Sequence, residues 1–283
     1  MKFTNRLLIF PSLALLFFVF SFCNKQNAEI KNTVSNTIAK DSVENNKSNV
    51  PGGLRKLVKA YPDFLDSADE NYLYWKDGTK MKYDDGREKD FEDMLDNASL
   101  KDQMSQEYGM GEDFENPPPV NFEPGRIRCE EFFRKIYGNT SGAAQGNLVN
   151  VTWMPKTVGS SIPFTSVNDA NIQLEAVSRE LDNLPENLKK YVTRLAGTFY
   201  WRVIAGTNRL SMHSFGIAID INTDYSNYWQ WDGGKKGKIE YRNKIPMEIV
   251  KIFEKYGFIW GGKWYHYDTM HFEYRPELLV SAN

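Results

Sequence analysis

Only three of the 283 residues are histidines, and all three lie in the last quarter of the chain, close to carboxylates. His213 and Asp220 belong to the segment RLSMHSFGIAIDIN, which is typical of a turn followed by an apolar strand. His271 belongs to the segment YDTMHFE near the C-terminal end. An ionisable group in an otherwise apolar strand is costly to bury without a partner, so these residues are the first candidates for chemistry.

Strand periodicity predicts how these side chains come together. Successive side chains of a strand face opposite ways, so Ile219 would face the core and Asp220 the other side. By the same rule, His271 and Glu273 share one face of the C-terminal strand. If the two strands pair, His271 lies near Asp220, and the preceding turn brings in His213.

Two imidazoles and one carboxylate are the ligand set of a catalytic zinc site with an open position, and we expect one Zn²⁺ per chain. A hydrogen-bonded His–Asp pair in a polar cluster is the simpler alternative. The same ligand types also form the facial triad of iron(II) oxygenases. In the 2-oxoglutarate enzymes a single residue usually separates His and Asp, whereas six residues separate His213 from Asp220.

The segment SMHSFGIAID resembles the Ser-x-His-x-x-Gly-x-Ala-x-Asp signature of the D-alanyl-D-alanine carboxypeptidase and L-alanyl-D-glutamate peptidase family of zinc enzymes. YDTMHFE resembles the second motif of that family, with an acid three residues before the last ligand histidine. The resemblance covers roughly residues 150–280. It implies that His213, Asp220 and His271 bind zinc and that Asp268 is the general base.

The resemblance also implies the fold and the substrate. It predicts an α+β protein in which a small antiparallel sheet is backed by helices, as in the Hedgehog/DD-peptidase-like zinc fold. The substrates would be peptidoglycan stem peptides. The carboxypeptidase branch generally has Glu where Asp268 stands, and Asp resembles the endopeptidase branch, so both bond types stay open. A module that keeps zinc but does not catalyse is the other alternative, and the presence of Asp268 argues against it.

An arginine near the metal has a role in the same family. Arg202 in TFYWRVIAG follows an aromatic residue upstream of the first ligand, where the resemblance implies that it polarises the substrate carbonyl or binds a carboxylate. A fixed guanidinium suits a developing oxyanion, and Arg209 is the rival candidate.

Other residues near the motifs are candidates for substrate contacts. Ser211 would brace the turn or form a hydrogen bond near the metal. Trp264 would wall the groove together with Trp260 and Tyr265. His266 is either a substrate contact or an exposed residue of an aromatic strand.

The composition is that of a folded protein, with 41% hydrophobic and 25% charged residues and a net charge of −2. No basic run indicates a nucleic-acid partner. We expect a monomer.

Residues 1–23 have the layout of an export signal, and Cys23 at its end suggests a lipoprotein anchor. The protein would then be periplasmic or attached to the membrane at the cell envelope. Cys129 would be a lone buried thiol.

The rest of the chain divides into three parts. Residues 24–53 are polar and predict a disordered tether. Residues 54–125 predict an extension packed on the core, with a hairpin near Asp77-Gly78 and a helix over 88–104. Residues 126–283 would form the zinc peptidase domain. Its helices are predicted over four ranges, 126–138, 168–184, 186–197 and 245–257. A strand is predicted over 147–155, and further strands cluster late, in an aromatic segment over 258–279.

Overall fold

The structure is a computed structural model, and it describes residues 49–234 and 239–282. The predicted export signal, the lipidation of Cys23 and nearly all of the predicted tether lie outside these residues. Residues 51–283 cluster as one compact unit. Among the helices of the described residues, none has the length and apolarity to cross a membrane.

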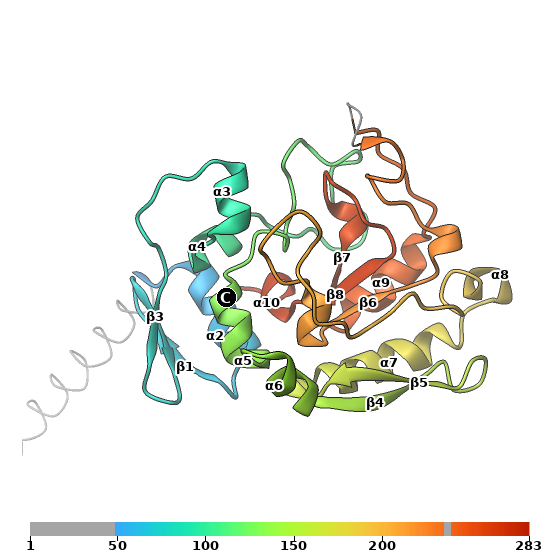
Figure 1. Cartoon of the computed structure of the whole chain (residues 1–283), viewed down its shortest axis with the longest axis horizontal. Coiled ribbons are helices and arrows are strands. Elements are labelled where there is room, and N and C mark those ends of the chain that lie inside the picture. Colours follow the sequence, from blue (N-terminus) through green and yellow to red (C-terminus); the bar gives the residue numbers. More distant parts are fainter. Residues whose placement is uncertain (1–48, 235–238, 283) are drawn as a thin grey trace, which may run out of the picture. The chain divides into compact units, whose positions relative to one another are not determined.

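The described elements run in a mixed order through the chain, as Figure 1 shows. The first part contains α2 (Gly52–Ala60), β1 (Leu65–Ala68), β2 (Tyr72–Trp75), β3 (Lys80–Lys82), α3 (Phe91–Asp96) and α4 (Leu100–Gln103). The middle part contains α5 (Glu130–Tyr137), α6 (Ser141–Gly146), β4 (Leu148–Trp153), β5 (Ser160–Thr165), the 3-10 helix η1 (Val167–Asp169), α7 (Ala170–Leu181) and α8 (Glu186–Lys189). The last part contains η2 (Met212–Phe215), β6 (Ala218–Asp220), η3 (Thr223–Tyr225), α9 (Met247–Lys255), β7 (Phe258–Trp260), η5 (Gly261–Lys263), β8 (His271–Tyr274) and α10 (Pro276–Leu279).

Three small antiparallel sheets form within the described residues, in the orders β1-β2-β3, β4-β5 and β6-β8-β7. The fold is therefore α+β, as the sequence predicts. The hairpin predicted near Asp77-Gly78 joins β2 to β3, and Gly78 has the positive φ of 83° that the turn requires.

The sheet β6-β8-β7 has the register that strand alternation predicts. Ile219 lies opposite Phe272, and Asp220 lies opposite His271. Phe272 stacks on Phe253 of α9, with ring centroids 3.9 Å apart. The apolar face is thus closed by α9, and Asp220 and His271 stand together on the other face.

The first part of the chain packs against the last through buried polar contacts. The hydroxyl of Tyr61 donates to Glu277 at 2.7 Å, where α2 meets α10. The hydroxyl of Tyr108 donates to Glu254 of α9 at 2.7 Å, and the indole of Trp264 donates to the carbonyl of Pro124 at 2.7 Å. Residues 54–125 therefore form part of the wall behind the C-terminal motifs.

Two predicted helices are shorter than expected. The predicted helix over 88–104 is two helices, α3 and α4, because Ser99 starts a new one with a capping box to Asp102. The predicted helix over 186–197 ends at Lys189. The backbone of Ala196 and Gly197 bonds instead to Asp220, which requires an extended chain.

Two further boundaries differ from the prediction. Helix α2 begins at Gly52, so its first two residues lie within the predicted tether. The predicted strand segment over 258–279 contains two short strands, β7 and β8, separated by η5 and a loop.

Candidate metal centre

The first histidine is presented by a tight turn ahead of β6. The hydroxyl of Ser211 accepts a hydrogen bond from the backbone of His213 at 3.4 Å and caps η2. Gly216 ends η2 with φ 69°, a conformation that favours glycine. A Cβ at Gly216 would also approach Leu148 to 2.6 Å. The turn thus braces His213 from both sides, which is the bracing role considered for Ser211.

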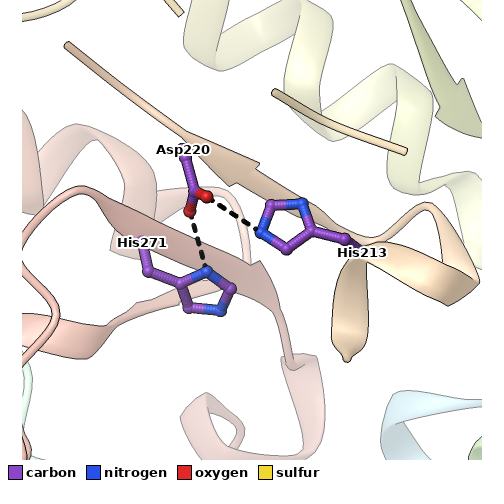
Figure 2. Close-up of side chains that lie close together, drawn as sticks. All are labelled: His213, Asp220 and His271. Atoms are coloured by element: carbon purple, nitrogen blue, oxygen red, sulfur yellow. Dashed lines mark hydrogen bonds and ion pairs between the residues drawn. The ribbon is translucent and has the colours of Figure 1, made fainter. Parts of the chain in front are cut away.

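The two histidines and Asp220 converge on one point, as Figure 2 shows. Asp220 Oδ2 lies 3.2 Å from His213 Nε2, and Asp220 Oδ1 lies 3.0 Å from His271 Nδ1. One nitrogen or oxygen from each of the three residues fits within a group no wider than 4.8 Å. These are the three residues that the sequence predicts as metal ligands.

Each ring has a second partner that fixes its tautomer. His213 Nδ1 lies 2.6 Å from the carbonyl of Thr198, which only accepts, so this nitrogen carries the proton. The lone pair of His213 Nε2 is then directed into the cluster. His271 Nε2 lies 3.2 Å from Glu273, which would likewise free Nδ1 for a metal.

Glu273 is completely buried behind His271. Burial alone would raise its pKa, but the hydrogen bond with His271 and the charges of Arg128 and Arg275 lower the pKa to about 2. Arg275 Nη1 donates to Glu273 at 2.9 Å. The carboxylate therefore stays charged and orients His271, and it does not reach the cleft as an alternative base would.

The cluster requires positive charge. Burial alone would lower the pKa of His271, but hydrogen bonds to Asp220 and Glu273 outweigh it and raise the pKa to about 10. Burial alone would raise the pKa of Asp220, yet His213 and His271 hold it well below its usual range. A divalent cation bound by these three side chains would meet the same requirement, and imidazole with carboxylate is a donor set that suits zinc.

Asp268 lies in the turn before β8 and lines the same cleft as the three residues. Burial and the neighbouring charge of Asp220 raise its pKa to about 7. Its Oδ1 is buried and has no hydrogen-bond partner within the described part of the chain. A general base needs an unpaired carboxylate oxygen that accepts a hydrogen bond from water, and Asp268 Oδ1 provides one in this cleft.

The cleft has a volume of about 350 Å³. It is lined by most of the residues that the sequence predicts for the site: Arg202, Arg209, Ser211, His213, Asp220, Trp264, His266, Asp268 and His271. Arg202 is exposed and Arg209 is partly buried, so either guanidinium can reach a ligand there.

Trp264 is nearly buried, with its ring centroid 5.6 Å from that of His271. Trp260 does not wall the cleft, because it is buried in the core, where it donates to the carbonyl of Thr269. Tyr265 is also not among the residues that line the cleft.

His266 is not an exposed strand residue. It lies in the loop between η5 and β8, and its Nδ1 pairs with the buried carboxylate of Glu123. Its ring also meets Trp229 edge to face, with centroids 4.6 Å apart. His266 is outside the three-residue cluster, so its place as a substrate contact stays a prediction.

Several residues of the cleft were not predicted from the sequence. They are Glu92, Arg126, Arg128, Tyr228 and Trp229. The first three come from the segment before α5, far from the histidine motifs in the sequence. Their types alone, charged and aromatic, do not distinguish them from ordinary surface residues.

The geometry can be compared with known proteins. Residues 205–274 match the family described as D-alanyl-D-alanine carboxypeptidase. The chain is also 36% identical over 72 residues to the peptidoglycan L-alanyl-D-glutamate endopeptidase CwlK of Bacillus subtilis (strain 168). That alignment covers 23% of this chain, and the chain spans about two fifths (40%) of the length of the curated relative. No solved structure matches the chain. The family resemblance found in the two motifs is thereby confirmed for residues 205–274.

Proposed function

We propose that this chain, whose residues 205–274 match D-alanyl-D-alanine carboxypeptidases, is a zinc-dependent peptidase that hydrolyses peptidoglycan stem peptides. The bond would be of the D-Ala-D-Ala carboxypeptidase or the L-Ala-D-Glu endopeptidase type. One observation carries the proposal: His213, Asp220 and His271 converge beside a carboxylate, Asp268, that has an unpaired buried oxygen in the same cleft. The Hedgehog/DD-peptidase-like fold is part of this proposal.

The chain's own residues divide the chemistry among them. His213 Nε2, His271 Nδ1 and one oxygen of Asp220 would hold the zinc ion, and Thr198 and Glu273 would orient the two rings. Bound zinc would supply a more acidic water and polarise the scissile carbonyl. Asp268 would take a proton from the attacking water and later pass it to the leaving amine.

Arg202 is the candidate for the oxyanion. Its side chain is exposed at the cleft and forms no ion pair with any residue that the structure describes. A guanidinium without an internal partner is available to bind the substrate carbonyl or a carboxylate. Ser214 accepts from its backbone N–H at 3.0 Å, which fixes the backbone from which the side chain extends.

The proposal is tested with one synthetic stem pentapeptide, L-Ala-γ-D-Glu-L-Lys-D-Ala-D-Ala, which contains both candidate bonds. The zinc-loaded protein is incubated with it, and the products are identified by mass. Both reactions release one alanine and leave tetrapeptides of equal mass, so the tetrapeptide is sequenced by fragmentation. A tetrapeptide that keeps the N-terminal L-alanine identifies a carboxypeptidase, and one that begins with D-glutamate identifies an endopeptidase. An intact peptide, with stoichiometric zinc bound, would favour the non-catalytic module.

The proposal extends to the cell envelope, because peptidoglycan lies outside the cytoplasmic membrane. The protein would be exported and attached to the membrane through a lipid on Cys23. Labelling of cells with a palmitate analogue tests this attachment. The label should appear on the wild-type protein and be lost in Cys23→Ser, and a label retained in this variant would refute it.

A further inference from the structure

The cleft has a basic wall that the proposed zinc chemistry does not use. Four arginines line it: Arg126, Arg128, Arg202 and Arg209. Arg202 is the candidate for the oxyanion, with Arg209 as its rival, and Arg128 helps to keep Glu273 charged behind His271. None of Arg126, Arg128 and Arg209 has yet been given a substrate group of its own. Arg126 and Arg128 lie outside the residues that match the peptidase family.

Arg128 is the most buried of these three arginines, with 10% of its side chain exposed. Its carboxylate partner in the described residues is Glu273, at 3.5 Å from Nη1. Glu273 makes closer contacts with Arg275 at 2.9 Å and with His271 at 3.2 Å. The positive charge of Arg128 is therefore only weakly compensated.

Arg209 is in a similar position on the same wall. Its side chain is 15% exposed, and its Nε is buried without a hydrogen bond in the described part of the chain. Asp96, whose side chain is 58% exposed, lies 3.2 Å from that nitrogen in an ion pair that does not make a hydrogen bond. A buried N–H donor without an acceptor costs free energy, which indicates that a bound ligand supplies the acceptor.

The arginines also lie close enough to repel one another. Arg128 and Arg209 both line a second, smaller hollow of about 20 Å³ as well as the main cleft. Burial lowers the pKa of Arg128 to about 10, although the charge of Glu273 opposes this. The positive charges of the neighbouring arginines, Arg275, Arg126 and Arg209, lower the pKa further. An anion between Arg128 and Arg209 would relieve this repulsion.

Arg126 is held differently. It pairs with the buried Glu123 and lies over the ring of Trp264 at 5.7 Å. It therefore contributes charge and position, while Arg128 has only a long contact to Glu273 and Arg209 has a buried donor without a hydrogen bond.

We propose that Arg128 and Arg209, supported by Arg126, form a carboxylate-binding subsite that selects stem peptides with a free carboxylate. The inference rests on the proposed peptidase function and names its substrate class: acidic, unamidated stem peptides. Guanidinium groups present paired N–H donors that match the two oxygens of a carboxylate. An amide in the same place would offer one acceptor and set its own donors against the arginines.

A stem peptide has two candidate carboxylates for this subsite, on the D-glutamyl residue and at the C-terminus. The experiment therefore uses three forms of the pentapeptide: the free acid, the form amidated at D-glutamate, and the form amidated at the C-terminus. The value of kcat/KM is measured for each with zinc-loaded full chain, with Arg209→Gln and with Arg209→Lys. Arg179→Gln, an exposed arginine of α7, is the matched control.

Charged hydrogen bonds of this kind predict that the wild type prefers the free acid over one amidated form by about tenfold to a hundredfold. Arg209→Gln should lose most of that preference, Arg209→Lys should keep part of it, and Arg179→Gln should keep all of it. The identity of the disfavoured amide tells which carboxylate binds. Equal kcat/KM values for all three peptides in the wild type, or an unchanged preference in Arg209→Gln, would overturn the subsite while leaving the peptidase intact.

Binding separates this inference from the proposed function. The dissociation constants of the three peptides are measured on zinc-loaded Asp268→Asn, with and without Arg209→Gln. A preference for the free acid that disappears with Arg209→Gln supports the subsite even if no peptide is cleaved by the wild type. Equal dissociation constants for all three peptides would refute it.

Discussion

The two histidines of the cluster present different ring nitrogens to Asp220. His213 uses Nε2 because Thr198 holds its Nδ1, and His271 uses Nδ1 because Glu273 faces its Nε2. The outer partners differ in chemistry, a neutral carbonyl for one ring and a buried carboxylate for the other. The carboxylate behind the His271 ring increases the basicity of that ring.

The positions of His271, inside the cluster, and His266, outside it, lead to a prediction for zinc binding. His271→Ala should reduce zinc from one ion per chain to almost none, whereas His266→Ala should retain it, because His266 pairs with Glu123 outside the cluster. Zinc per chain is measured by elemental analysis after dialysis. Full zinc in His271→Ala together with zinc lost from His266→Ala would exchange their roles.

The sequence was sufficient to identify the three clustered side chains but not their support. Alternation along two strands predicts that Asp220 and His271 share a face, and the observed register agrees. The charge on Glu273 depends on Arg128, which lies 145 residues away in the chain. No local sequence pattern predicts such a contact, because the contact forms only when the segment before α5 packs behind β8.

At the scale of elements, the turn between residues 211 and 216 determines where His213 lies. Ser211 caps η2, Gly216 ends it in a left-handed conformation, and β6 follows at once. Ser214 is buried within the turn and bonds to the backbone of Arg202. The turn therefore couples the first histidine to the segment that carries the candidate arginine.

Gly216→Ala should destabilise the protein by about 1–3 kcal/mol, because it combines an unfavourable φ with a clash against Leu148. Gly142→Ala is the control: this position lies in α6 with nothing within 4 Å of the added carbon, and alanine should stabilise the helix by about 0.5–1 kcal/mol. Urea unfolding monitored by circular dichroism measures both. Equal stability of Gly216→Ala and the wild type would show that the turn tolerates a side chain.

Helix lengths were the weakest part of the sequence prediction, for a physical reason. Apolar spacing continues through 186–197, but the backbone there is required at the edge of β6, where Ala196 donates to Asp220. Tertiary hydrogen bonding thus outweighs local helical preference. The boundary at Ser99 was in principle readable, since Ser99 and Asp102 form a capping box.

At the scale of the whole described molecule, residues 54–125 supply part of the cleft. Glu123 has no exposed side-chain surface, and it bonds to both Arg126 and His266. It therefore ties the N-terminal segment to the loop that carries Asp268. The predicted extension is then a structural part of the site wall, which the composition of this segment did not indicate.

Glu123 gives the protein a defined pH dependence of stability. Burial alone would raise its pKa, but Arg126 and His266 outweigh burial and lower it. A lowered folded-state pKa stabilises the protein above the unfolded value of about 4.3, and that stability is lost as the pH falls through the folded-state pKa. The free energy of unfolding of the metal-free protein should therefore fall below about pH 4.

Glu123→Gln should make that fall in stability shallower, and Glu131→Gln, at an exposed position of α5, should not. Urea unfolding at a series of pH values measures the effect. Identical pH profiles for the wild type and Glu123→Gln would remove Glu123 from this account.

The compact unit beginning at Pro51 predicts that residues 51–283 fold without the preceding segment. The fragment should unfold cooperatively and bind one zinc ion per chain. A fragment starting at Leu54 lacks the first turn of α2 and should be less stable. Failure of the 51–283 fragment to fold, when the full chain folds, would overturn the boundary.

The central claim is that a zinc ion and Asp268 act together in one cleft, and one paired measurement tests it. Zinc per chain and turnover of the stem pentapeptide are determined side by side for the wild type and for Asp268→Asn, which is nearly isosteric. We expect unchanged zinc and a loss of turnover of about 10²–10⁴-fold, the usual contribution of a general base. Zinc lost from Asp268→Asn would make Asp268 a ligand, and undiminished turnover with full zinc would contradict its role as the base.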